Sequence, residues 1–479
     1  MITVIRIITA ILAITSLSFS LPIITALYYG EQNMLLPFAL PMAIMIVLSA
    51  LILLLTRGKG KILNLRQSYI VVALSWSITS VFGAIPLFSS GAIKSITGAI
   101  FESVSGFTTT GATVIGDIDS MPKSINLWRC LEHWLGGMGI VTLTVALLPL
   151  LGVGGFQLIK AETTGPEKGK VTPKIATTAK VLWFIYLGFT IAQTVLLKIA
   201  GMGFFDSLCH AFATLGTGGF STKSASIGYY NNGAIDVICT VFMFLAGVNF
   251  SLYFYVFTGK ISELKTNSEL KAYLGIYATV TLLLTLCIKN AYPSLLTALR
   301  YASFQVSSII TTTGFATADY TTWSASAQFL IFILFFIGGC SGSTGGGIKV
   351  IRWVVLAKQI GNEIKKTLHP HGVYSLRLNS SPSGKGILIS VASFIFLYLL
   401  LIFATTFASC LAGFDLLTAF TASLSMVGNI GPAFGSLSPS FTWQAVPSAL
   451  KLVYSFAMLA GRLELYTMLI FFFPSFWHA

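Results

Sequence analysis

Long apolar runs alternate with short polar segments along the whole chain. Most runs hold about 20 residues, which is the length that a helix needs to cross a bilayer. Strands of a membrane barrel would be about ten residues long and would alternate polar with apolar positions, and these runs do neither. The pattern therefore predicts an all-α polytopic membrane protein.

The first two predicted helices stand apart from the rest of the pattern. They cover residues 3–27 and 36–55, and a basic segment at 57–68 closes them. The first run follows Arg6 and has no small-residue cleavage site, so we expect a retained helix rather than a signal peptide. Residues 1–68 are accordingly predicted to form two extra N-terminal transmembrane helices.

The rest of the chain repeats one pattern four times: a spanning helix, a short apolar helix, a Gly-rich turn and a second spanning helix. The short helix of each unit cannot span a bilayer, which is typical of a segment that re-enters on the side it came from. We expect ten spans and four tandem helix–pore-helix–helix units in a pseudo-fourfold arrangement around one pore. Units 1 to 4 are assigned to residues 69–155, 156–260, 261–360 and 361–479, and their predicted helices are 69–87, 95–106 and 126–151; 181–199, 206–214 and 236–258; 272–289, 294–309 and 328–356; 387–411, 415–426 and 443–473.

Composition and charge agree with a membrane location. The chain is 55% hydrophobic and 9% charged, whereas soluble proteins carry about 25% charged residues. The net charge of +14 comes from basic residues in alternate inter-helix segments, including 160–180 and 349–385. This asymmetry is the positive-inside pattern, so both termini are expected to be cytoplasmic. The same placement argues against a nucleic-acid partner.

The scattered cysteines and histidines indicate neither a metal site nor an enzyme. The six cysteines form no C-x-x-C motif, and the five histidines have no HExxH spacing. We expect no covalent cofactor and no catalytic residues. His210 is expected to support the filter from behind, and Asn249 to make an interhelical hydrogen bond. The glycines that follow His133, at 136, 137 and 139, are expected to permit close helix packing, with a proton relay at His133 as the alternative.

Each short helix is followed by a turn of similar sequence. Aligned without gaps, the four turns place a glycine at one position: Gly111, Gly219, Gly314 and Gly431. A dehydrated cation needs oxygen ligands, which backbone carbonyls supply without fixed charge, and glycine adopts the required conformations easily. We therefore expect one ion-binding filter built by Thr109, Thr110, Gly111, Gly218, Gly219, Thr313, Gly314, Ile430 and Gly431, with the ion bound at all of these except Thr109.

The four turns resemble those of the Trk/Ktr/HKT superfamily of potassium transporters, and the whole chain is most similar to the bacterial Trk membrane subunit. The resemblance rests on Thr110-Gly-Ala-Thr113, Gly218-Gly-Phe-Ser-Thr222, Thr313-Gly-Phe-Ala-Thr317 and Asn429-Ile-Gly-Pro432. It implies uptake of potassium and rubidium across the bacterial inner membrane, assembly as a homodimer, and control by a cytosolic nucleotide-binding regulatory subunit of the TrkA type.

Two details of the turns refine the resemblance. In this superfamily a serine in place of the first filter glycine accompanies sodium selectivity, so Gly111 implies potassium. Asn429 and Ile430 stand where the other turns have Thr or Gly. We therefore expect the filter to be imperfectly symmetric.

A Gly-rich stretch interrupts the second predicted helix of unit 3. Six of the ten residues at 338–347 are glycine. Glycine costs about 1 kcal/mol per residue in a helix interior, so an unbroken helix is not expected. An irregular stretch at membrane depth must face water or protein, and we place it on the axis beneath the filter. A phosphate-binding loop would need a lysine directly after the glycines. The resemblance implies an intramembrane gating loop here, with a static kink as the alternative; its residues are Gly338, Gly339, Ser341, Gly342, Ser343, Thr344, Gly345, Gly346 and Gly347.

Arg462 is a charge within the last apolar run. An arginine at the centre of a membrane helix costs about 2.5–3.5 kcal/mol, so its side chain should face the protein interior. Glu464 is two residues away, on another side of the helix, and is a poor partner. The resemblance places an arginine near the gate, and we expect Arg462 to face the pore or the loop and to raise a cation barrier. A packing salt bridge to another helix is the alternative.

The function expected from the sequence is gated, passive uptake of potassium. The alternative within transport is a sodium- or proton-coupled symporter, although four same-direction units match a channel-like plan better. A membrane enzyme would need clustered catalytic residues, which the sequence does not show. The basic segments are expected to contact a soluble regulator or anionic membrane lipid.

Overall fold

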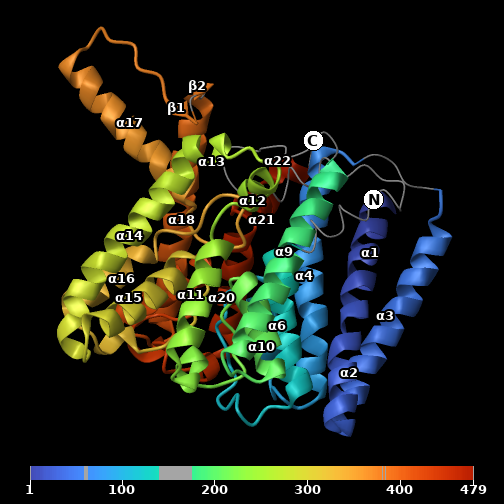
Figure 1. The fold of residues 1–479 in the computed structure, drawn as a ribbon. Coiled ribbons are helices and arrows are strands. Elements are labelled where there is room, and N and C mark those ends of the chain that lie inside the picture. The colour runs from blue at the N-terminus through green and yellow to red at the C-terminus, as the bar shows by residue number, and fades with distance from the viewer. Residues whose placement is uncertain (1, 59–62, 140–174, 380, 383–384, 478–479) are drawn as a thin grey trace.

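The computed structural model describes residues 2–58, 63–139, 175–379, 381–382 and 385–477. The described chain is helical apart from two paired strands of two residues each, β1 (Arg377–Leu378) and β2 (Ser381–Pro382). Most helices run side by side in one bundle (Figure 1). Large apolar side chains are exposed on many of these helices, as expected where lipid is the solvent.

The two N-terminal helices form as predicted. The first span comprises α1 (Ile2–Ser18) and α2 (Ser20–Tyr29), and the second is α3 (Leu35–Leu55). They lie at the edge of the bundle, where α1 packs against both α3 and α4 (Leu65–Ser89) (Figure 1). The loop between them is tied to unit 1, because Glu31 accepts hydrogen bonds from the backbone nitrogens of Lys123 and Ser124 at 2.6 and 3.0 Å.

The spanning and short helices of all four units follow the predicted order. In each unit the first helix packs on the short helix that follows it. The helices of successive units are α4, α5 (Ile96–Phe107) and α6 (Lys123–Gly137); α9 (Ile175–Ile199), α10 (Phe204–Leu215), α11 (Gly233–Ala246) and α12 (Phe250–Phe257); α14 (Ser268–Ile288), α15 (Leu295–Ile310), α16 (Ala325–Leu334) and α17 (Val350–Leu368); α18 (Lys385–Leu411), α19 (Leu416–Gly428), α20 (Ser448–Arg462), α21 (Tyr466–Leu469) and α22 (Pro474–Trp477). Short connecting helices are α13 (Ser262–Thr266), η1 (Gln32–Met34), η3 (Ser226–Tyr230), η4 (Lys289–Ala291), η5 (Tyr320–Thr322), η6 (Gly435–Leu437), η7 (Trp443–Ala445) and η8 (Ile470–Phe472).

Two helices that we predicted to be continuous are broken. The second helix of unit 2 bends by 93° between α11 and α12, and the last helix bends by 119° between α20 and α21. In unit 2, Asn249 caps α12 by accepting a hydrogen bond from the backbone nitrogen of Ser251 at 2.9 Å, and asparagine is a favoured helix cap. In unit 4, Glu464 and Leu465 have φ values of 58° and 57°, which no helix accommodates.

The second helix of unit 3 is interrupted, as its glycines predicted. It ends at Leu334 and the chain resumes helical structure at Val350. In unit 1 the predicted helix extends beyond α6 into residues 140–151, which lie outside the described residues. Six described helices are long and apolar enough to cross a membrane, or eight spans if each bent pair counts once.

The two ends of the described chain lie at the same end of the bundle, which is also the end where α13 lies (Figure 1). The helix α17 projects from that end, away from the other helices (Figure 1). Its outer half carries exposed apolar side chains one turn apart at Ile360, Ile364 and Leu368, which are 61%, 58% and 70% exposed.

Candidate functional site

The four Gly-rich turns share one backbone conformation. In each turn the residue two positions before the aligned glycine, called the reference glycine below (Gly111, Gly219, Gly314 or Gly431), has a positive φ: 57° at Thr109, 54° at Thr217, 58° at Thr312 and 55° at Asn429. Two residues later each reference glycine has a positive φ as well, at 79°, 79°, 81° and 103° in chain order. Glycine accepts such angles without the steric cost that a Cβ atom brings.

The hydrogen bonds of the turns repeat in the same way. The backbone nitrogen before each reference glycine donates to a carbonyl of the short helix: Thr110 to Ser105 at 2.9 Å, Gly218 to Ala213 at 2.8 Å, Thr313 to Ser308 at 2.8 Å and Ile430 to Ser425 at 3.0 Å. These four N–H groups bond to the short helices, and the carbonyl oxygens of the same four residues point toward the neighbouring turns.

These carbonyl oxygens meet the glycines of the neighbouring turns in a closed ring. A Cβ atom on Gly111 would collide with the carbonyl oxygen of Gly218, and one on Gly219 would collide with that of Thr313. The same holds for Gly314 with the oxygen of Ile430, and for Gly431 with the oxygen of Thr110. Each turn therefore touches the next, and the fourth touches the first, so the four glycines surround one axis.

Hydroxyl and amide side chains brace the turns from behind. Thr108 donates to the Val104 carbonyl at 2.6 Å and pairs with the hydroxyl of Thr110 at 2.9 Å. Thr311 makes the equivalent bonds in unit 3, to Ser307 at 2.6 Å and to Thr313 at 2.7 Å.

Asn429 departs from this pattern, as its sequence predicted. Its amide donates to the Thr110 hydroxyl and to the Met458 carbonyl, both at 3.0 Å, and so links turn 4 directly to turn 1.

The two buried histidines also lie behind the turns. His133 bonds the Gly106 carbonyl through Nδ1 at 2.7 Å and stacks on Phe220 with 4.1 Å between ring centroids. Its ring fills the space that a side chain on Gly218 would need. His210 pairs with the hydroxyl of Ser221 at 2.9 Å. Both side chains therefore act as packing and hydrogen-bonding supports of turn 2.

A buried ion pair that sequence reasoning missed holds turns 1 and 2 together. Arg129 on α6 binds Glu102 on α5 at 2.8 Å, and both side chains are fully buried. Glu102 also accepts from the backbone nitrogen of Val114 at 2.7 Å, and Arg129 donates to the Ser221 carbonyl at 3.3 Å. The only sequence signal was one acidic and one basic residue within apolar helices.

The interrupted segment of unit 3, residues 338–347, lies against the ends of two short helices and is called the loop below. The backbone nitrogen of Gly346 donates to the Thr312 hydroxyl at 2.7 Å. A Cβ atom on Gly345 would lie 2.9 Å from the Thr311 carbonyl oxygen, and one on Gly346 would lie 2.6 Å from that of Gly428. The loop thus contacts turns 3 and 4 directly.

The break in unit 2 supplies hydrogen-bond partners for the loop. The backbone nitrogen of Cys340 donates to the Gly247 carbonyl at 2.8 Å, and that of Phe250 donates to the Gly342 carbonyl at 3.0 Å. The hydroxyl of Thr344 bonds the Ala246 carbonyl at 3.2 Å. Backbone groups that an unbroken helix would pair internally are paired with the loop instead, which satisfies both irregular segments at membrane depth. We expected Asn249 to form an interhelical bond, whereas its side chain caps α12.

Arg462 faces the loop rather than lipid. Its guanidinium donates to the Thr344 carbonyl at 2.7 Å and to the carbonyls of Gly136 and Gly137 at 2.8 and 3.1 Å. It therefore joins the loop to the end of α6. Glu464 forms an ion pair with Arg352, in line with the expectation that it is not the partner of Arg462.

Carboxylates link neighbouring units on the outer side of the turns. Asp119 accepts a hydrogen bond from the backbone nitrogen of Ser224 at 3.1 Å, and Asp319 accepts one from the Ser440 hydroxyl at 2.8 Å. Burial by itself would raise the pKa of Asp319, but hydrogen bonds from Thr321 and Ser440 outweigh it and hold the pKa below the ordinary 3.8. Both carboxylates lie outside the membrane-spanning helices.

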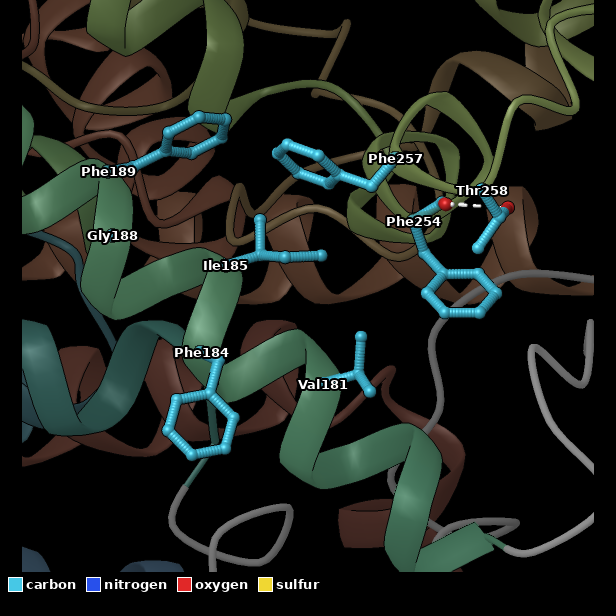
Figure 2. Close-up of a pocket in the computed structure, with 8 residues that line it drawn as sticks. All are labelled: Val181, Phe184, Ile185, Gly188, Phe189, Phe254, Phe257 and Thr258. Atoms are coloured by element: carbon cyan, nitrogen blue, oxygen red, sulfur yellow. Dashed lines mark hydrogen bonds between the residues drawn. The ribbon is translucent and has the colours of Figure 1, made fainter.

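Other candidate chemistry is absent from the described part of the chain. Within it, no group of three or more His, Cys, Asp or Glu side chains could hold a metal ion. A groove of about 440 Å³ lies between α9 and α12, lined by Val181, Phe184, Ile185, Gly188, Phe189, Phe254, Phe257 and Thr258 (Figure 2). Its lining is almost wholly apolar, so it offers no ligands to an ion.

Comparisons with known proteins identify the family of the chain. The TrkH family, described as a cation transport protein, matches residues 36–479. The Trk system potassium uptake protein TrkH of Halomonas elongata is 40% identical over 479 residues, covering 99% of this chain and 98% of that protein. The Trk system potassium uptake protein TrkG of Escherichia coli is 36% identical over 470 residues, covering 97% and 96%. The crystal structure of the potassium transporter TrkH from Vibrio parahaemolyticus superposes with a TM-score of 0.89 at 36% identity and covers 99% of each chain. With matches of this extent in sequence and in fold, the chain belongs to the TrkH family of cation transport proteins.

Proposed function

We propose that this protein takes up potassium, and rubidium in its place, through the filter formed by the four turns. The observation that carries the proposal is the closed ring in which each reference glycine meets a carbonyl of the next turn. Oxygens arranged around one axis can replace the hydration shell of a bare cation. The relatives named above are potassium uptake proteins, which supports the choice of ion.

The proposed ligands are backbone oxygens with threonine hydroxyls behind them. Potassium binds at Thr110, Gly111, Gly218, Gly219, Thr313, Gly314, Ile430 and Gly431, and Thr109 belongs to the same turns. The short helices end at these turns, and the negative partial charge at a helix C-terminus favours a cation there. Metal-ion chemistry beyond the transported ion is not required, and no enzymatic activity is proposed.

The loop is the proposed gate of this path. It lies against turns 3 and 4 and is held by Arg462 through the Thr344 carbonyl. A guanidinium beside the path repels a cation, so displacement of the loop together with release of Arg462 opens the way. The gating residues are those predicted from the sequence: Gly338, Gly339, Ser341–Ser343, Thr344, Gly345–Gly347 and Arg462.

The proposed setting is the bacterial inner membrane, with both termini in the cytoplasm and the basic segments on that side. A homodimer fits the projecting helix α17, whose Ile360, Ile364 and Leu368 form an apolar face that is exposed among the described residues. The proposed cytosolic regulator is a nucleotide-binding subunit of the TrkA type.

The structure corrects one part of the expected docking surface for such a regulator. Lys349 and Arg352 are only 2% and 5% exposed, since Lys349 bonds the Gly345 carbonyl and Arg352 binds Glu464. They brace the loop and are unavailable to a soluble partner. Lys365 and Lys366 remain exposed in this segment. Most of the other basic segment, 160–180, lies outside the described residues.

Rubidium uptake into vesicles tests the proposed filter. Wild-type protein should take up rubidium in response to membrane potential alone, whereas a requirement for a sodium or proton gradient would support the coupled symporter. Gly111→Ser and Gly314→Ser should lower the preference for rubidium over sodium, because each adds a side chain at a positive φ against a carbonyl oxygen. Unchanged selectivity in both variants would refute the filter.

A further inference from the structure

One backbone group near the start of the loop and one just after its end converge on a single carboxylate that the proposed mechanism does not use. Glu269 lies in the first turn of α14 and is 5% exposed. Its Oε1 atom accepts a hydrogen bond from the backbone nitrogen of Ser341 at 2.7 Å and another from that of Ile351 at 3.0 Å. These two donors are ten residues apart in the chain, and the segment between them includes most of the loop.

The position of Glu269 explains how a buried carboxylate is tolerated there. A negative charge is favoured in the first turn of a helix, where the free N–H groups carry positive partial charge. Hydrogen bonds to an ionised acceptor are stronger than those between neutral groups. The side chain therefore has a stable place on α14 and strong bonds to the loop, while α14 itself is a long, regular spanning helix.

The loop has further contacts on both sides of Ser341. Cys340 and Gly342 pair with the break in unit 2. Thr344 binds Arg462 and Gly346 binds Thr312, and both lie between the two donors to Glu269. Backbone bonds from Gly338 to the Ile348 carbonyl at 2.8 Å and from Val350 to the Gly339 carbonyl at 3.2 Å also join the two ends of the loop. Glu269 adds a side-chain anchor to these backbone bonds, and together they limit how far the loop can move.

We propose that Glu269 is a positioning residue that anchors the loop in the conformation described here and so limits how often it leaves the path. The inference deepens the proposed function, because its effect on uptake rests on the loop being the gate. Weakening the anchor should increase the mobility of the loop and raise basal uptake, while the filter and its selectivity should be unaffected.

Cys340 provides a native reporter of loop mobility. It precedes Ser341 directly, is a free thiol and is 1% exposed. Labelling by a soluble maleimide, followed by mass spectrometry of each cysteine peptide, measures how often the loop exposes it. Cys130 and Cys239 are fully buried in helices away from the loop and report on loss of the whole fold.

The experiment compares wild type, Glu269→Gln and Glu269→Ala in the full chain reconstituted into vesicles. Glu269→Gln keeps an acceptor oxygen but loses the charge, and Glu269→Ala removes both bonds. We expect Cys340 to label about tenfold faster in Glu269→Ala, which corresponds to about 1.4 kcal/mol, and to a lesser degree in Glu269→Gln. Cys130 should stay unlabelled and basal rubidium uptake should rise in the same order. The control is Glu263→Gln, an exposed carboxylate on α13 without contact to the loop, which should behave as wild type.

The outcomes separate this inference from the proposed function. Equal Cys340 labelling in wild type and in Glu269→Gln and Glu269→Ala would overturn the anchor. If Cys130 is also labelled in Glu269→Ala, that variant has lost its fold. The labelling of Cys340 in Glu269→Gln then tests the anchor alone. Faster labelling with unchanged uptake would support the anchor but contradict the loop as the gate. A wild-type protein that takes up no rubidium would contradict the proposed function, and the labelling result would still stand.

Discussion

The four turns share one structure, whereas the second helices of the same units differ from one another. The turns repeat one conformation, with the same signs of φ and the same hydrogen bond to the preceding helix in every unit. The second helices of units 2, 3 and 4 are each interrupted in a different way: by a 93° bend, by a 15-residue irregular segment between α16 and α17, and by a 119° bend. The fourfold repeat therefore includes the turns that form the ring of glycines but not the second helices that follow them.

The difference follows from what each region contacts. Oxygens that surround one point must be supplied alike from every side, so departures from the repeat are costly there. The loop belongs to the second helix of unit 3. The second helices of units 2 and 4 contact it and so support it. Repetition is what the proposed ion-binding ring requires, whereas the proposed gate requires only one segment that differs from the other three.

The largest expected effect comes from breaking the repeat in the turns with Gly219→Ala. The new Cβ atom would collide with the Thr313 carbonyl oxygen at a φ of 79°, and strain at such a position is about 1–3 kcal/mol before the collision is counted. Rubidium uptake should fall at least about tenfold and discrimination against sodium should be lost. Gly188→Ala, in α9 with no atom within 4 Å of its Cβ position, should leave uptake unchanged. Selective uptake by Gly219→Ala would mean that the ring does not bind the ion.

A second test concerns the asymmetric region through Arg462→Ala. The variant loses charged hydrogen bonds to Thr344 and to the end of α6, each of the order of 1.5–3 kcal/mol. Basal uptake should rise about tenfold while selectivity stays the same, as measured by rubidium flux with sodium as competitor. Arg462→Lys keeps the charge with fewer donors and should lie between the two. If Arg462→Ala changes neither flux nor regulation, the barrier hypothesis is wrong.

The replacement Asn429→Thr would place a threonine two residues before the reference glycine in all four turns. It removes the amide bonds to Thr110 and Met458, which are worth about 1 kcal/mol each. Uptake should decrease by a few fold, with weaker discrimination against sodium, because turn 4 is no longer tied to turn 1. An increase in selectivity would instead show that Asn429 is a defect in the repeat that the protein tolerates.

The smallest expected effect is on the outer links between units. Because the folded pKa of Asp319 lies below its ordinary 3.8, its ionised form stabilises the protein above that pH, and the contribution is lost as pH falls through the lowered pKa. The contribution is below about 1 kcal/mol for a partly exposed carboxylate. Thermal unfolding from pH 6 to pH 3 should show a smaller decline in Asp319→Asn than in wild type. The same decline in both would exclude a role for this side chain.

The features predicted well from the sequence depend on local chemistry. Glycine at 111, 219, 314 and 431 has few local substitutes at a positive φ, and the six glycines within 338–347 cannot sustain a helix, so both features can be read from neighbouring residues. The long apolar runs likewise predicted α3, α4, α14 and α18 to within four residues at each end, whereas the helices predicted at 236–258 and 443–473 are broken.

The features that were missed depend on partners far away in the chain. The break after Ala246 lies in an apolar stretch marked only by Gly247, Asn249 and Ser251, and it becomes favourable because the loop, about 90 residues later, pairs with its open backbone groups. The pair of Glu102 and Arg129 and the buried position of Lys349 have the same origin. A single sequence shows which residues are costly to bury but not which distant group offsets that cost.

The contact between Gly431 and Thr110 has a consequence for how the protein is made. It joins positions 321 residues apart, and it is the contact that closes the ring. During synthesis three quarters of the circle can be in the membrane for a long time before the last turn leaves the ribosome. Long-range closure of this kind is slow and comes late. A chain truncated before residue 431 would therefore hold an open arc of three turns without the contact that completes the proposed filter.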